Sequence, residues 1–222
     1  MRATAAKHKI HLVRDLCETG AQVALTASAA GTAAPEIPAA PEIPERMGRL
    51  ARLLAVDERL LVAARRLHGP WRTKLACTLT RVGDASSWTL LVLALLAAGG
   101  SLAPIGARMG VAALLATGLS QLLKRRLNRP RPTRAIDGFE ALADNPDAFS
   151  FPSGHTAAAF AVAVALAGAP FGFGPATLLL ALGIGVSRVY LGAHYPLDVA
   201  AGAALGSIAG AAARIAVAAL GG

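Results

Sequence analysis

The residues of this sequence that are best suited to chemistry lie in three short polar segments between long apolar stretches. The first segment is rich in lysine and arginine, the second reads Pro-Ser-Gly-His, and the third combines arginine, histidine and aspartate. Cations, backbone amides at a helix start and imidazoles together favour the binding and transfer of an anionic group such as phosphate. The candidate residues are Lys124, Arg131, Ser153, Gly154, His155, Arg188, His194 and Asp198.

Two histidines are candidates for the reacting groups. His194 and Asp198 are four residues apart, and Pro196 lies between them. Because proline suits the first position of a helix, we expect Asp198 in a first turn, where its carboxylate can reach back to His194. Such a carboxylate holds an imidazole in one tautomer and stabilises its cationic form, which leaves the other nitrogen available for attack. His155 is a second imidazole, suited to general acid and base catalysis.

The remaining candidates are suited to holding an anion. Lys124, Arg131 and Arg188 supply fixed positive charge, and the planar guanidinium group matches the geometry of phosphate oxygens. Ser153 and Gly154 lie at an expected helix start, where free backbone N–H groups and the helix dipole favour anions. The sequence therefore predicts a phosphate cradle next to the histidines.

Apolar helices must position these residues. A helix that crosses a membrane needs about 20 mostly apolar residues, and neighbouring helices joined by short loops run in opposite directions. One face of the bundle then carries four helix ends: the end of the second helix, the start of the third, the end of the fourth and the start of the fifth. This arrangement brings the candidate residues together. The expected helices cover residues 86–103, 105–124, 154–169, 173–191 and 197–219.

The composition indicates the class of protein. Charged residues make up 16% of the 222 residues and hydrophobic residues 55%, yet the net charge is +9. An average soluble domain has about 25% charged residues. These values argue against an acidic disordered protein, a disulfide scaffold and a coiled coil, and they indicate a membrane protein, a concentrated anion site, or both. Together with the five apolar segments they predict an all-α integral membrane bundle with about five transmembrane helices. The alternative is a soluble helical bundle with an alanine-rich core, which five consecutive apolar segments disfavour.

The first part of the chain differs from the rest. Residues 33–44 repeat Ala-Ala-Pro-Glu-Ile-Pro, and their prolines block helix formation, so residues 1–45 are expected to form a disordered tail with a Pro-rich linker. Residues 46–85 show helical periodicity with many arginines. We expect amphipathic helices at the membrane surface there; an exposed helix packed on its own domain is the alternative. Residues 86–222 would form the catalytic transmembrane domain.

The three polar segments resemble the signature of the type 2 phosphatidic acid phosphatase superfamily. That signature combines Lys, six residues, Arg-Pro; then Pro-Ser-Gly-His; then Ser-Arg, five residues, His, three residues, Asp. The resemblance covers roughly residues 86–219 and shows no substitution in the motifs. The matching residues are Lys124 with Arg131 and Pro132, residues 152–155, and Ser187 and Arg188 with His194 and Asp198.

The resemblance implies an all-α membrane phosphatase and a role for each residue. His194 would be the nucleophile that forms a phosphohistidine, Asp198 would orient it, and His155 would protonate the leaving oxygen and then activate water. The family needs no metal or other cofactor, and the sequence shows no carboxylate or histidine cluster suited to two metal ions. The residues that would hold the phosphoryl oxygens are Lys124, Arg131, Ser153, Gly154 and Arg188.

The expected partners are the bilayer and a lipid-phosphate substrate, with no nucleic acid, because much of the positive charge lies at one end of the bundle. By resemblance, candidate substrates are polyprenyl phosphates or diphosphates, phosphatidylglycerol phosphate and phosphatidate. Residues 133–150, with four acidic side chains, form either a lid that screens headgroups or a solvated connection. Two other functions stay open: a non-enzymatic membrane protein that binds anionic lipids, and a vanadate-dependent haloperoxidase-like activity.

The abundance of alanine, glycine and arginine, together with the compact layout, predicts a multi-pass protein of a bacterial plasma (inner) membrane. The side of the membrane that the site faces stays open, because the cations that would bind phosphate also contribute to the loop charge that sets orientation. The pattern gives no indication of the oligomeric state.

Overall fold

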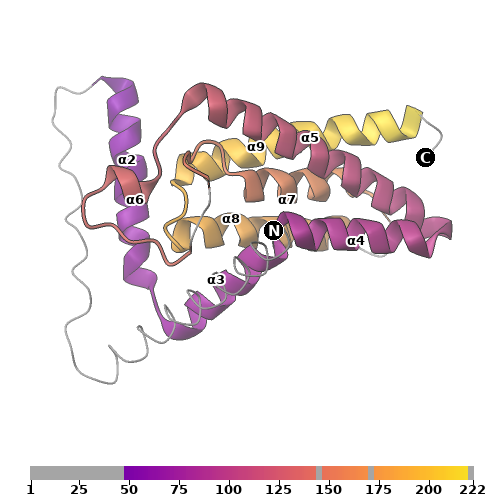
Figure 1. Cartoon of the computed structure of the whole chain (residues 1–222), viewed down its shortest axis with the longest axis horizontal. Helices are drawn as coiled ribbons and strands as arrows, with labels where there is room; N and C mark the ends of the chain where they lie inside the picture. Colours follow the sequence, from indigo (N-terminus) through magenta and orange to yellow (C-terminus); the bar gives the residue numbers. More distant parts are fainter. Residues whose placement is uncertain (1–47, 144–146, 170–172, 220–222) are drawn as a thin grey trace, which may run out of the picture.

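The computed structural model describes residues 48–143, 147–169 and 173–219. Within these ranges the regular structure is helical (Figure 1), and an isolated bridge between Pro130 and Phe149 is the only β-type pairing. The predicted all-α fold is therefore confirmed, whereas the predicted tail over residues 1–45 lies outside the described residues. The elements are α2 (Arg49–Ala64), η1 (Arg65–Leu67), α3 (Pro70–Val82), α4 (Ala85–Ala98), η2 (Gly100–Leu102), α5 (Ala103–Leu127), α6 (Pro132–Ala135), α7 (Gly154–Ala165), α8 (Phe173–Tyr190) and α9 (Pro196–Ala219).

The five predicted apolar helices are α4, α5, α7, α8 and α9, and Figure 1 shows them running along the long axis of the molecule. Three spans among the described residues are long and apolar enough to cross a membrane: α5 with η2, α8 and α9. Helices α3 and α4 are apolar enough only as a pair, bent by 52°, which is either a fourth, broken span or a re-entrant loop. The described residues therefore give three or four spans where about five were predicted, and α3, which was expected at the surface, packs against α8.

Helix α7 is shorter than predicted and lies in the centre of the bundle. It ends at Ala165 instead of residue 169, and its 12 residues span about 18 Å, less than the ~30 Å of a hydrocarbon core. Its alanines are buried against α5, α8 and α9. Small residues allow such close contact: a Cβ atom at Gly202 of α9 would lie 2.6 Å from the Ser153 carbonyl oxygen.

Large apolar side chains cover the outside of the bundle. Leu90, Leu114, Leu179 and Ile215, from four different helices, are each exposed by more than two thirds. A soluble protein rarely presents such a surface, whereas a bilayer is an apolar solvent in which helices satisfy their own backbone groups. The outer surface therefore agrees with a membrane-embedded bundle.

Helix α2 crosses one end of the bundle, nearly at right angles to the long helices (Figure 1). It buries Leu61 and Val62 against the protein and exposes Leu50, Leu53 and Leu60. The predicted amphipathic helix is thus present. The polar ends of α5, α8 and α9 lie at the end of the bundle that α2 covers.

Candidate active site

The ends of four helices meet beneath α2 and supply the candidate residues. Helix α5 ends, α7 begins, α8 ends and α9 begins at this end of the bundle (Figure 1). Lys124 lies in the last turn of α5 and Arg188 in the last turn of α8, while Asp198 lies in the first turn of α9. Ser153 caps α7, so His155 follows in its first turn.

The imidazole of His194 lies between a carboxylate and a cation. Its Nδ1 atom is 3.5 Å from Oδ2 of Asp198, and its Nε2 atom is 3.4 Å from Nη1 of Arg131. A guanidinium group has donors but no acceptor, so Nε2 must present its lone pair to Arg131. In the neutral ring the proton is then assigned to Nδ1, which lies near Asp198 but has no hydrogen-bond partner among the described residues.

Backbone contacts hold the loop that carries His194. The carbonyl oxygen of Arg188 accepts hydrogen bonds from the N–H groups of Ala193 and His194, at 3.0 and 3.3 Å. Nη1 of Arg131 donates to the carbonyl oxygen of Ala193 at 2.8 Å. The backbone of Arg188 and the side chain of Arg131 therefore hold the loop that carries the candidate nucleophile.

The surroundings of His194 favour its neutral form. Its side chain is 1% exposed, and burial holds its pKa well below the usual value, an effect that the positive charges of Arg188, Arg131 and Lys124 reinforce. A histidine with a lowered pKa is unprotonated at neutral pH. Its Nε2 atom, which contacts Arg131, then carries a lone pair and no proton.

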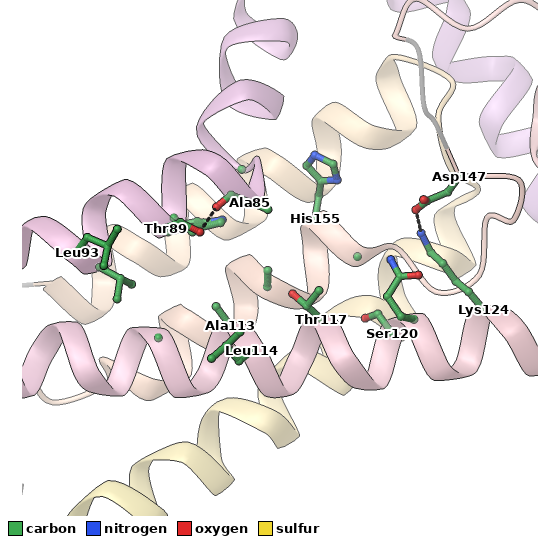
Figure 2. Close-up of a pocket in the computed structure, with 17 residues that line it drawn as sticks. Ala85, Thr89, Leu93, Ala113, Leu114, Thr117, Ser120, Lys124, Asp147 and His155 are labelled. Carbon is green, nitrogen blue, oxygen red and sulfur yellow. Dashed lines mark hydrogen bonds and ion pairs between the residues drawn. The ribbon is translucent and has the colours of Figure 1, made fainter. Parts of the chain in front are cut away.

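The cations of the expected cradle contact the segment that follows α6. Nζ of Lys124 donates to Oδ2 of Asp147 at 2.6 Å (Figure 2), and Nε of Arg131 donates to the carbonyl oxygen of Asp147 at 2.6 Å. Although burial opposes ionisation, Lys124 holds the pKa of Asp147 below its usual value. The described part of the segment over residues 133–150 therefore places an ionised carboxylate at the site; Asp144 lies outside the described residues.

The start of α7 differs in one respect from the sequence prediction. The N–H group of Ser153 donates to the carbonyl oxygen of Asp198 at 3.0 Å, so this amide is not free for an anion. The hydroxyl oxygen of Ser153 accepts from the hydroxyl group of Thr156 at 2.9 Å, which leaves the Ser153 proton as a donor. The bond to Asp198 joins the start of α7 to the first turn of α9.

His155 has an acidic partner that the sequence analysis missed. Its Nε2 atom is 2.8 Å from Oδ1 of Asp84, which is the residue that precedes α4. A carboxylate at this distance orients an imidazole and fixes its tautomer. The sequence signal was an aspartate at the expected start of a helix, a pattern that is also typical of ordinary helix capping.

A cavity of about 350 Å³ extends from these residues between α4 and α5. Figure 2 shows Lys124, Asp147 and His155 at one end of the cavity, and Leu93, Ala113 and Leu114 towards the other. Gly154 also lines it. The cavity thus joins a charged end to an apolar end.

Among residues 48–143, 147–169 and 173–219, no group of three or more His, Cys, Asp or Glu side chains is placed to hold a metal ion. The candidate residues are cations and imidazoles next to single carboxylates. The cationic side chains supply positive charge and donate hydrogen bonds, so they are suited to binding an anion.

Comparison with known families gives the same assignment as the motifs. A family model described as PAP2 superfamily matches residues 105–220, which is more than half of the chain. This chain belongs to the PAP2 superfamily. The match includes all three polar segments of the candidate site.

Several bacterial proteins are similar to this PAP2 chain. A decaprenylphosphoryl-5-phosphoribose phosphatase from Mycobacterium tuberculosis is 38% identical over 102 residues, 46% of this chain and 55% of the relative. A lipid A 1-phosphatase from Rhizobium etli is 36% identical over 106 residues, 46% of each chain. The bacitracin transport permease protein BcrC from Bacillus licheniformis is 32% identical over 96 residues, 43% of this chain and 47% of the relative. The chain spans about half the length of these curated relatives.

Two solved structures share the PAP2 fold described above. LpxE from Aquifex aeolicus has a TM-score of 0.63 at 27% identity and covers 78% of this chain and 98% of the solved chain. A transmembrane PAP2-type phosphatidylglycerolphosphate phosphatase from Bacillus subtilis has a TM-score of 0.61 at 26% identity and covers 76% and 86%. These similarities support a membrane protein with an all-helical fold.

Two charged residues that the PAP2 motifs do not specify contact the predicted site. Arg129 donates to Oδ1 of Asp198 at 2.7 Å and to Oδ2 of Asp57 at 2.6 Å. Asp57 belongs to α2, far along the chain from the motifs. A signal for Asp57 was present, because it lies three residues after Leu54 and four before Leu61, on the apolar stripe of its helix.

Proposed function

We propose that the protein is a membrane lipid phosphatase that hydrolyses a lipid-linked phosphate or diphosphate monoester through a phosphohistidine, without a metal ion. The observation that carries this proposal is the position of His194. Its Nδ1 side faces the Asp198 carboxylate and its Nε2 side faces Arg131, in a loop held by the backbone of Arg188. That arrangement suits a neutral nucleophile beside an anion-binding group.

In the first proposed step, Nε2 of His194 forms a bond to the terminal phosphorus while the bond between that phosphorus and the leaving oxygen breaks. The leaving oxygen belongs to the lipid alcohol in a phosphate substrate and to the inner phosphate in a diphosphate substrate. His155 gives a proton to that oxygen as it leaves. Asp198 stabilises the positive charge that develops on the imidazole of His194. The cations Lys124, Arg131 and Arg188 stabilise the phosphoryl oxygens, because phosphoryl transfer depends mainly on positioning and charge.

In the second proposed step, water attacks the phosphorus atom and gives a proton to His155. The bond between phosphorus and Nε2 of His194 breaks, inorganic phosphate leaves, and the neutral imidazole is restored. Asp84, 2.8 Å from His155, supports the cationic form of His155 that is present before the first proton transfer and again after the second. The protein thus returns to its starting protonation state after one turnover.

The contact between Lys124 and Asp147 bears on substrate binding. A carboxylate oxygen 2.6 Å from Nζ of Lys124 lies where a phosphoryl oxygen would bind the same ammonium group. We infer that substrate phosphate displaces the Asp147 side chain from Lys124. The described end of the segment over residues 133–150 then acts as part of a lid.

The cavity between α4 and α5 favours a lipid substrate. A phosphate at Lys124 and His155 would place an attached hydrocarbon chain along the apolar end near Leu93 and Leu114. The similar proteins named as phosphatases of decaprenylphosphoryl-5-phosphoribose and of lipid A support this substrate class. The same similarity supports the plasma membrane of a bacterium as the location.

A direct assay tests the function. We expect purified protein in detergent to release phosphate from at least one of polyprenyl diphosphate, phosphatidylglycerol phosphate and phosphatidate. Release should persist in EDTA and stop with orthovanadate, which mimics the phosphoryl group in transfer. An activity that EDTA abolishes and a divalent metal restores would contradict the mechanism, and no release from any lipid would contradict the function.

A bulky residue in the cavity should separate lipid from soluble substrates. We expect Thr117→Trp to raise KM for a long-chain lipid phosphate by about tenfold, the scale of losing part of an apolar binding site. The activity towards a water-soluble phosphate ester should stay within about twofold, because the charged end is unchanged. Thr117 lines the cavity on α5.

Leu122→Trp is the matched control for this experiment. Leu122 lies on the same helix, is 54% exposed and is outside the cavity lining. Its replacement should leave both KM values unchanged. An equal loss on both substrates for Thr117→Trp would show that the cavity does not hold the lipid chain.

A further inference from the structure

We propose that Asp57 of α2 is a positioning residue for His194 and that it acts through Arg129 and Asp198. The inference rests on the proposed function, because its effect is on the reaction of His194. Helix α2 would then be part of the catalytic apparatus as well as a surface helix. The three PAP2 motifs specify neither residue: Asp57 lies outside them, and Arg129 is one of the six unspecified residues between Lys124 and Arg131.

The contacts form a continuous chain from α2 to the imidazole. Nη2 of Arg129 donates to Oδ2 of Asp57 at 2.6 Å, and Nη1 donates to Oδ1 of Asp198 at 2.7 Å. The side chains of Asp57 and Asp198 are 1% and 0% exposed. The guanidinium group therefore joins two buried carboxylates through two different nitrogens, a geometry that fixes both.

Both oxygens of Asp198 have partners that set its orientation. Oδ1 accepts from Arg129, and Oδ2 accepts from the N–H group of Tyr195 at 3.0 Å while lying 3.5 Å from Nδ1 of His194. Rotation of this carboxylate would break bonds at both oxygens. Because Asp57 holds the far side of Arg129, it limits the movement of Asp198 relative to His194.

Asp57 also holds the helix on which Asp198 is carried. Its Oδ1 atom accepts from the N–H group of Leu197 at 2.7 Å, in the first turn of α9. That N–H group has no partner within its own helix. The two oxygens of Asp57 thus reach the Asp198 side chain through Arg129 and its backbone through Leu197.

The charges give Asp57 a second role beside positioning. Two carboxylates around one guanidinium group leave a net charge of −1, which can stabilise a cationic imidazole at His194. Without the charge of Asp57, Arg129 and Asp198 would form a neutral pair, and Asp198 would stabilise that cation less. The Tyr195 ring, 4.0 Å from the Arg129 guanidinium carbon, keeps Arg129 in place on a third side.

The amide variant Asp57→Asn distinguishes the contact of Asp57 with Arg129 from its contact with the Leu197 N–H group. Its oxygen can still accept from Leu197, but its NH₂ group cannot accept from Arg129. We expect kcat to fall by about 10- to 100-fold, the usual cost of losing an outer partner of a reacting group. KM should stay within about twofold, because the cradle is unchanged.

Glu58→Gln is the matched control, since it removes the same charge from the next residue of α2, which is half-buried. It should keep wild-type kcat. Arg129→Lys is the second variant, because one ammonium group cannot reproduce the two-nitrogen bridge, and it should lower kcat similarly. Adding Asp57→Asn to Arg129→Lys should then lower kcat by less than a further twofold, since coupled residues are not additive.

The outcomes distinguish this inference from the function on which it rests. Wild-type protein that hydrolyses lipid phosphate, with His194→Ala inactive, supports the function. If folded Asp57→Asn then keeps kcat within twofold, the positioning role is overturned and the function stands. The same holds if the decrease in kcat of the double variant equals the product of the decreases caused by Asp57→Asn and Arg129→Lys alone. A wild-type protein without phosphatase activity overturns both.

Discussion

Replacement of His194 by alanine should abolish phosphate release. We expect kcat to fall by about 10⁴-fold or more, because removing the nucleophile leaves only substrate binding and charge stabilisation. The variant should keep its fold and its affinity for orthovanadate within an order of magnitude, because Lys124, Arg131 and Arg188 remain. Released phosphate, measured on the best lipid of the panel, gives the result.

A trapping experiment identifies the intermediate. With wild-type protein, acid-labile and alkali-stable phosphate should be found on His194 by mass spectrometry after rapid mixing, since a phosphorus–nitrogen bond hydrolyses in acid. His68→Gln is the control, because His68 has a structural contact with the Tyr190 carbonyl oxygen at 2.8 Å, is not one of the candidate site residues, and can be replaced there by glutamine, which still donates. Substantial activity in His194→Ala would contradict the proposed mechanism.

The sequence predicted the helices and the candidate residues of the motifs for a physical reason. Uncharged stretches of membrane length can be recognised without knowing their partners, and alternating helix directions then determine which ends meet. This reasoning placed Lys124, Arg188 and Asp198 at one end of the bundle, where the structure also has them. The roles of these residues stay predictions until the variants are measured.

Other features depend on tertiary contacts that a pattern does not contain. Periodicity placed Asp57 in an amphipathic helix, but its buried position follows from the contacts of α2 with Arg129 and with the start of α9. Similarly, the arginine-rich segment between Lys124 and Pro132 does not indicate which arginine contacts Asp198. The length of α7 was overestimated because an alanine-rich run continues past Ala165, where the helix ends.

The separation between α7 and α9 depends on glycine, so Gly206→Ala should have a large effect on both stability and activity. A Cβ atom at Gly206 would collide with the Ala157 carbonyl oxygen, a backbone atom that moves only if α7 moves. We expect a loss of about 1–3 kcal/mol or more in stability, typical of an overpacked core. Because α7 carries His155 and the loop before α9 carries His194, their separation should change and kcat should fall as well.

Gly118→Ala is the matched substitution for Gly206→Ala. Gly118 lies in α5, and a Cβ atom there would meet nothing within 4 Å. Alanine favours a helix over glycine by about 1 kcal/mol, so this variant should be at least as stable as the wild type. Thermal unfolding in detergent should therefore move in opposite directions for the two variants. Equal Tm values would show that α7 and α9 can move apart without a loss of stability. The close contact between these helices would then not be what sets the separation of His155 and His194.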